Sequence, residues 1–83
     1  MHKLKYIRFD TALADSVFLF PSWEAHAEVA LRLGYTPVSA GFVHIQVNEH
    51  GQIVVQTYGR SESLNMESNP ADAELILHML KMN

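Results

Sequence analysis

The chain has 83 residues, which is room for a single domain, 1–83. Six Lys or Arg against nine Asp or Glu give it a net charge of −3. Its 48% apolar and 18% charged residues exclude the composition of a disordered protein. The chain has no cysteine, which excludes disulfides and thiolate metal sites and favours a cytoplasmic protein, and its densest apolar run is too short to cross a membrane.

The N-terminal part predicts two strands followed by a helix. Residues 3–9 mix β-prone side chains, and the apolar run 17–20 is a second strand that Pro21 ends. A helix is expected to begin at Ser22, whose hydroxyl can accept a hydrogen bond from the first turn, and to end at Gly34. Its expected buried stripe contains Trp23, Ala27, Ala30, Leu31 and Leu33.

The middle of the chain predicts a β-hairpin. Residues 38–47 alternate, with Val43, Ile45 and Val47 on one face and Phe42, His44 and Gln46 on the other. Residues 48–51 form a turn that ends in glycine, and residues 53–58 form the returning strand. Both strands carry one apolar face, so this hairpin is the element that the sequence specifies best.

A second helix is expected near the C-terminus. Asn69 is its cap, Pro70 its first residue, and Asp72 complements the helix dipole in the first turn. The order is therefore β-β-α-β-β-α, which predicts an α+β fold with a four-stranded antiparallel sheet and two helices packed on it, both on one side. The residues expected in the core are Val43, Ile45, Val47, Ile53, Val55, Ile76, Leu77 and Leu80.

Catalytic and metal-binding motifs are not evident. The five histidines, His2, His26, His44, His50 and His78, lack the spacing of a metal site, so neither a metal nor another cofactor is predicted. The run 59–63 approaches the nucleophile elbow of serine hydrolases but ends in serine where that motif has glycine. The carboxylates are scattered, and we therefore predict that the chain is not an enzyme.

Four residues are candidates for binding: Trp23, Phe42, Tyr58 and Arg60. Phe42 and Tyr58 are expected to be neighbours across the hairpin, where aromatic rings more often pack on each other than bind a ligand. Aromatic rings on a sheet can also stack nucleic-acid bases, but that use requires basic residues, and only Arg60 is close in sequence. Trp23 is either a core residue or an interface anchor.

Three segments carry a resemblance to a known group of proteins. They are Pro37-Val38-Ser39-Ala40-Gly41-Phe42-Val43, Gly59-Arg60-Ser61-Glu62-Ser63-Leu64-Asn65 and Ser68-Asn69-Pro70-Ala71-Asp72-Ala73. Together they resemble small uncharacterised proteins encoded by bacteriophages and prophages, over roughly the C-terminal half. Compact phage proteins of this kind are often inhibitors of host machinery, including defence complexes, so the resemblance implies that setting and no catalytic motif.

The functional expectation is a small non-enzymatic interaction protein that binds another protein or protein complex, plausibly as a phage-type inhibitor of host defence. The partner is a different protein or a second copy of the chain in a homodimer, and a membrane is not expected. Two alternatives stay open. One is a nucleic-acid-binding accessory protein that uses the hairpin at 38–60, which the net charge of −3 disfavours. The other is a small enzyme or enzyme subunit.

Overall fold

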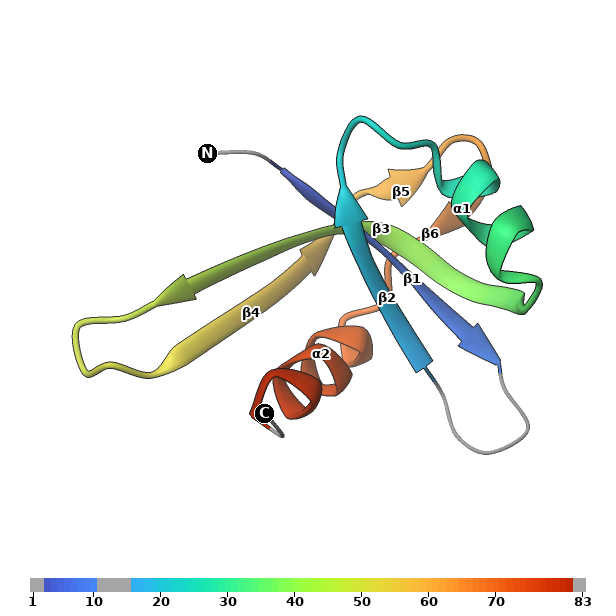
Figure 1. Ribbon diagram of the computed structural model, residues 1–83. Coiled ribbons are helices and arrows are strands. Elements are labelled where there is room, and N and C mark those ends of the chain that lie inside the picture. The colour runs from blue at the N-terminus through green and yellow to red at the C-terminus, as the bar shows by residue number, and fades with distance from the viewer. Residues whose placement is uncertain (1–2, 11–15, 82–83) are drawn as a thin grey trace.

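The computed structural model describes residues 3–10 and 16–81 and contains a four-stranded antiparallel sheet in the order β2-β1-β3-β4 (Figure 1). The predicted α+β fold is confirmed. A two-stranded ribbon, β5 with β6, was not expected from the sequence. The elements are β1 (Leu4–Asp10), β2 (Ser16–Pro21), α1 (His26–Leu33), β3 (Thr36–Val47), β4 (Ile53–Tyr58), β5 (Arg60–Ser61), β6 (Met66–Glu67) and α2 (Ala71–Lys81).

Strand β1 lies in the middle of the sheet and pairs with β2 on one side and β3 on the other. Leu4 is opposite Pro21 in β2 and opposite Val43 in β3. The β1–β3 register shifts between Arg8 and Phe9, where one strand bulges. Among the described residues, strand β4 pairs with β3 alone, through the predicted hairpin, so β2 and β4 form the two edges of the sheet.

The two helices cover opposite faces of the sheet, which corrects the expectation that both lie on one side. Successive residues of a strand point to opposite faces, and both Tyr6 and Ile7 of β1 are buried. Ile7 packs with Val29 of α1, whereas Tyr6 packs with Ile76 of α2. Figure 1 shows α1 and α2 on the two sides of the strands. The central strand therefore contributes to two small cores, one under each helix.

The core contains more of the N-terminal half than the sequence pattern suggested. Val43 and Ile76 are buried as expected, but Val47 is 66% exposed near the hairpin tip and Leu77 is only half-buried. Ile45, Ile53, Val55 and Leu80 are also half-buried. Ala30 of the expected helix stripe is buried as well. The buried apolar residues outside that stripe and the expected core are Tyr6, Ile7, Phe9, Phe20, Val29 and Ala40.

Helix α1 begins at His26, later than the sequence predicts. Ser22 is not its cap: residues 22–24 form a turn, and Ala25 is the residue before the helix. The Ala27 amide in the first turn instead donates to the Ser63 hydroxyl, from the loop between β5 and β6, at 3.0 Å. The residues that α1 buries are His26, Val29 and Ala30, whereas Leu31 of the expected stripe is 84% exposed. The predicted end is confirmed, because Gly34 adopts a φ of 76° and donates to the Ala30 carbonyl at 3.0 Å.

Helix α2 begins as its local sequence predicts. The Asn69 side-chain oxygen accepts a hydrogen bond from the Ala71 amide at 3.0 Å, which is the expected cap, and Pro70 immediately precedes the helix. The helix packs against β4 and reaches β2. Neither α1 nor α2 is long and apolar enough to span a bilayer.

Candidate functional site

A row of side chains crosses the α1-facing side of the sheet, one from each strand. Lys5 of β1 is opposite Phe20 of β2 and opposite Phe42 of β3, and Phe42 is opposite Tyr58 of β4. These four positions therefore share a face and a register. Arg60 follows two residues after Tyr58 and lines a pocket together with Lys5 and Phe42.

We call Lys3, Lys5, Phe42, Tyr58 and Arg60 the aromatic–cationic patch. The Phe42 and Tyr58 rings are stacked, with centroids 5.6 Å apart and planes at 22°. The Lys3 ammonium lies 5.7 Å from the Phe42 ring centroid, which is within the range of a cation–π contact. Three of the four binding candidates, Phe42, Tyr58 and Arg60, are thus brought together, and the predicted cross-strand neighbours are confirmed.

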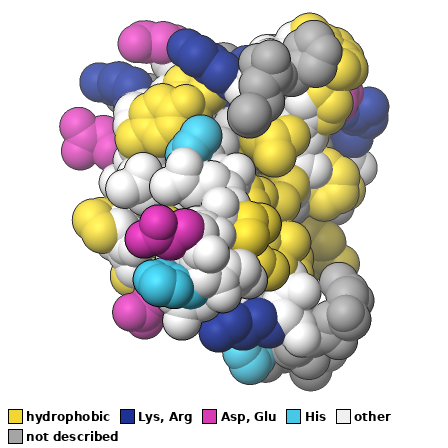
Figure 2. All heavy atoms as spheres, turned by 90° about the vertical axis from the view of Figure 1, so that its left-hand side faces the viewer, with side chains coloured by type: hydrophobic (Ala, Val, Ile, Leu, Met, Phe, Trp, Pro, Cys, Tyr) yellow, Lys and Arg dark blue, Asp and Glu magenta, His cyan; other side chains and the backbone are white. Residues whose placement is uncertain are grey.

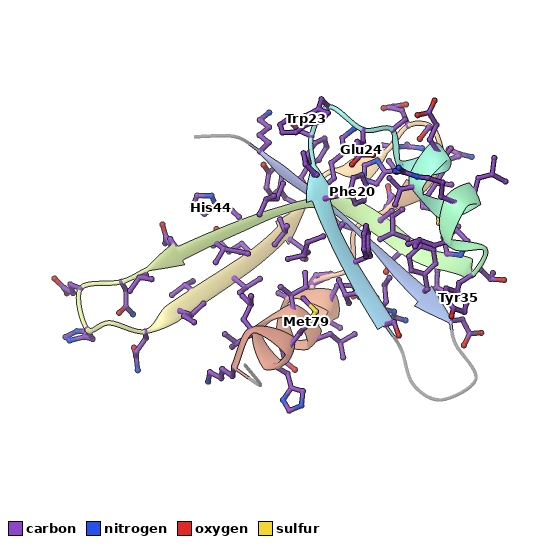
Figure 3. The ribbon with its side chains drawn as sticks, viewed as in Figure 1. Phe20, Trp23, Glu24, Tyr35, His44 and Met79 are labelled. Carbon is purple, nitrogen blue, oxygen red and sulfur yellow. The ribbon has the colours of Figure 1, made fainter. Side chains whose placement is uncertain are left out.

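Trp23, the fourth candidate, lies at the margin of the patch and is 72% exposed, so it is not a core residue. It belongs to the turn after β2, and the next residue, Glu24, accepts a hydrogen bond from the Lys5 ammonium on its carbonyl at 2.8 Å. Figure 3 shows Trp23 and Glu24 at the same end of the molecule as Phe20. The turn therefore lies next to Lys5.

The patch borders an open pocket of about 460 Å³ between the sheet and the segment that follows β4. The residues that line it are Lys5, Ala25, His26, Phe42, Gly59, Arg60, Glu62 and Ser63. The aromatic ring and the small residues supply apolar surface, while Lys5 and Arg60 add positive charge. Figure 2 shows Lys and Arg side chains beside hydrophobic ones at the top of the face it presents, with acidic side chains at the margin.

Half of the chain's cations gather at this patch. The structure describes all six Lys and Arg, of which Arg8 pairs with Asp72 and Arg32 pairs with Glu24. Lys3, Lys5 and Arg60 are the three at the patch. Arg60 also donates to the Asn65 side chain and lies 4.0 Å from a Glu62 carboxylate oxygen.

Lys3 and Lys5 are not among the site residues expected from the sequence. Only Arg60 is near Phe42 and Tyr58 along the chain, and the two lysines come close only because β1 pairs with β3. Their spacing of two residues, which places both on one face of a strand, was a usable signal. What the spacing does not reveal is which strand lies beside them.

His26 forms a fixed wall of the pocket. Its Nε2 lies 2.9 Å from the Gly41 carbonyl oxygen, and since a carbonyl only accepts, this nitrogen carries the proton and donates. The imidazole packs edge-on against both Phe20 and Phe42. Burial lowers the pKa of His26 below its ordinary value, against a smaller opposite effect of the Gly41 bond. The ring is therefore neutral at pH 7.

A second polar cluster lies inside the protein, around Asp72. One carboxylate oxygen accepts hydrogen bonds from the Tyr6 and Ser39 hydroxyls, both at 2.6 Å, and the other pairs with Arg8 at 2.9 Å. Asp72 is fully buried, so its role exceeds the dipole interaction that the sequence suggested. Burial and the bond to Asp72 raise the pKa of Tyr6. The Asp72 carboxylate is enclosed, so the cluster joins α2 to the sheet, and Arg8 is only partly exposed.

The other residues weighed for chemistry are not brought together. Ser61 is buried and accepts a hydrogen bond from the Leu64 amide, so it stabilises the loop between β5 and β6. His44 lies near Gln46 on β3, whereas His50 is at the hairpin turn beside Glu49. Across residues 3–10 and 16–81, no three His, Asp or Glu side chains gather closely enough to hold a metal ion.

A second hollow, of about 660 Å³, lies along the edge of β4 and the start of α2. Its lining residues are His44, Val55, Gln56, Thr57, Tyr58, Pro70 and Ala73. Tyr58 therefore belongs to the patch and also lines this hollow. None of the described residues in that lining is Lys, Arg, Asp or Glu, in contrast to the pocket at Lys5 and Arg60.

Comparison of the chain with family models, with curated proteins and with solved structures gives no match. Function is therefore inferred from the patch and its pocket.

Proposed function

We propose that this chain is a small non-enzymatic binding protein that docks on another protein through the aromatic–cationic patch. The observation that carries the proposal is the exposure of aromatic rings beside cations: Tyr58 is 42% exposed, and Trp23 at the margin is more exposed still. Aromatic residues and arginine are enriched among the residues that dominate binding energy at protein interfaces. Tyr58, Trp23 and Arg60 are residues of that kind.

The packing that holds Phe42 in place also supports docking of the patch on another protein. Phe42 is held by stacking on Tyr58 and by the edge of His26, which is itself bonded to the Gly41 carbonyl. Side chains that are already fixed lose little conformational entropy when a partner binds. The patch is therefore pre-organised for docking.

The setting that we propose is a phage-type inhibitor of host defence machinery, acting in the cytoplasm. Its support is the resemblance of the segments 37–43, 59–65 and 68–73 to phage and prophage proteins. Phe42 and Arg60 belong to the first two segments, so the residues that carry the resemblance include two members of the patch. If an excess of this protein leaves the activity of a host defence complex unchanged, the proposed setting is contradicted. The docking proposal is not affected by that result.

The docking proposal is tested by one charge substitution and one matched control. Tyr58→Glu places a carboxylate in the patch at an exposed position, and Leu31→Glu makes the same change on the exposed side of α1. We expect Tyr58→Glu to abolish capture of the partner from host lysate and Leu31→Glu to retain it, with both variants showing the circular dichroism spectrum of the parent protein. Equal capture by the two variants would refute the proposal.

A second copy of the chain is the other partner to consider, and the edge strand β4 is the observation that favours it. Its sequence, Ile53 to Tyr58, contains neither a charge nor a proline, the usual devices that keep an edge strand from pairing. Antiparallel pairing of two β4 edges about a two-fold axis would produce a homodimer. Light scattering over a concentration series should then show a dimer. Gln56→Lys should disrupt this dimer, whereas His44→Lys, at the paired position on β3, should not. A monomer at all concentrations excludes it.

A further inference from the structure

We infer that the partner segment that docks on the patch is an acidic protein segment with an apolar side chain for the pocket. The inference rests on the proposed function and adds the chemistry of the partner. It is drawn from the charge of the patch, the composition of the pocket and the way in which the Phe42 ring is already packed.

The charge of the patch is opposite to that of the chain. The protein carries a net charge of −3, yet Lys3 lies over the Phe42 ring, and Lys5 and Arg60 line the pocket to which that ring contributes. Of the described residues that line the pocket, one, Glu62, is acidic, and its side chain is largely exposed at 4.0 Å from Arg60. Carboxylates of a partner are complementary to this local excess of positive charge, and such complementarity governs specificity and association rate.

The pocket offers apolar surface beside two of these cations. Phe42, Ala25 and Gly59 contribute its apolar surface, and Lys5 and Arg60 also line it. His26 adds a neutral ring that is fixed by its bond to Gly41. An aromatic or aliphatic side chain of the partner would fill the pocket, while acidic residues on either side of it would reach the cations.

A single-stranded nucleic acid fits the patch less well. The Phe42 ring already has Tyr58 stacked on it and the Lys3 ammonium over it, so its faces leave little room for a base to stack, whereas a side chain in the pocket needs only the part of Phe42 that lines it. A nucleic acid also places one charge at every nucleotide, and the negative charge of the rest of the protein repels a long polyanion. A short acidic segment needs only the local positive charge.

The test uses two blocked peptides that differ only in charge. One has a central phenylalanine with two acidic residues on each side, and the other has the corresponding Asn and Gln amides in place of the acids. Binding is followed by the backbone NMR shifts of Phe42, Gly59 and Arg60, with a short oligothymidylate as the third probe. We expect the acidic peptide to bind about tenfold more tightly than the amide peptide, through charge-assisted hydrogen bonds to the cations.

Matched variants locate the charge effect. Lys3→Gln combined with Arg60→Gln should weaken binding of the acidic peptide about fivefold or more. Lys81→Gln, which removes a positive charge at the end of α2, should leave it unchanged. Equal binding of both peptides, tighter binding of the oligothymidylate, or an equal effect of Lys81→Gln would overturn the inference. If the amide peptide binds as well as the acidic one, the docking site stands and only the acidic chemistry fails, whereas the Tyr58→Glu experiment tests the docking site itself.

Discussion

Tyr6 and Asp72 are 66 positions apart in the chain and share a hydrogen bond of 2.6 Å inside the protein. The Tyr6 hydroxyl donates to the carboxylate and accepts from the Asn69 amide at 3.2 Å, immediately before α2 begins. One phenol thus joins the central strand to both the cap and the first turn of the last helix. The bond lies in the core under α2, so its removal affects the fold and not the binding surface.

Tyr6→Phe should lower the free energy of unfolding by about 1–3 kcal/mol, because it leaves buried polar groups without a partner. Denaturant titration measures the change. Tyr35→Phe is the matched control, since Tyr35 is exposed, and should change stability little. Equal effects of the two substitutions would mean that the Tyr6 hydroxyl contributes nothing specific.

The burial of the Tyr6 hydroxyl, together with its bond to Asp72, predicts a loss of stability at alkaline pH. The folded state raises the pKa of Tyr6 above its ordinary value of 10.0, so the folded protein keeps a proton that the unfolded chain releases. This contribution is complete below about pH 10 and is lost as the pH rises above it. Urea unfolding at increasing pH should show a steeper decline for the parent protein than for Tyr6→Phe. Parallel declines would contradict the prediction.

His26 predicts a loss of stability at acidic pH, which is the opposite pH dependence to that of Tyr6. Burial lowers the pKa of the folded imidazole, so the unfolded chain binds more protons below the ordinary value of 6.5. The contribution is complete above about pH 6.5 and decreases as the pH falls towards 5. His26→Gln keeps a donor for the Gly41 carbonyl without a titrating ring. Its stability should therefore fall less than that of the parent protein over this range, and an equal fall would refute the assignment.

The packing of α2 predicts that truncating two adjacent residues to alanine will cost different amounts of stability. Ile76 is buried against Tyr6 and Val43, whereas Leu77 is half-buried. Ile76→Ala should cost about 2–5 kcal/mol and Leu77→Ala clearly less. Thermal melts of the two variants decide the question. A larger loss of stability for Leu77→Ala would mean that α2 turns Leu77, and not Ile76, towards the sheet.

Gly41 predicts a steric effect beside the patch. A Cβ atom at this position would lie 2.7 Å from the Tyr58 carbonyl oxygen and 2.9 Å from the Ser68 Cβ. Gly41→Ala should therefore cost about 1–3 kcal/mol and shift the NMR signals of Tyr58. Gly51 gives the contrast: it has a φ of 77° in open space, so Gly51→Asn should be tolerated. If Gly41→Ala keeps the full stability of the parent protein, β3 and β4 can move apart at Gly41 and Tyr58.

The parts of the fold that local sequence determines were predicted correctly. The hairpin follows from the alternation of Val43 and Ile45 with Phe42 and His44, and α2 follows from Asn69 and Pro70. In each case the pattern and the structure are governed by residues within a few positions of one another. The same locality made Phe42, Tyr58 and Arg60 recognisable as neighbours.

The parts that tertiary contacts determine were not predictable from pattern. Ser22 has the chemistry of a helix cap, but residues 22–24 form a turn whose Glu24 carbonyl is bonded to Lys5 of β1. The placement of the helices on opposite faces depends on β1 lying inside the sheet, which its mixed sequence, with Lys5 and Arg8 among apolar residues, does not reveal. The approach of Lys5 to Phe42 and the burial of Asp72 have the same origin, since their partners are distant in sequence.

The central position of β1 has a kinetic consequence. Its pairing with β3 joins Leu4 to Val43, and its side chains complete the cores under both helices. The hairpin alone therefore cannot bury its apolar residues, and folding has to wait for a large loop to close. Topologies dominated by such distant pairings fold in about milliseconds to seconds, far more slowly than helical bundles. We expect refolding in a single slow phase, because neither core forms without the same strand.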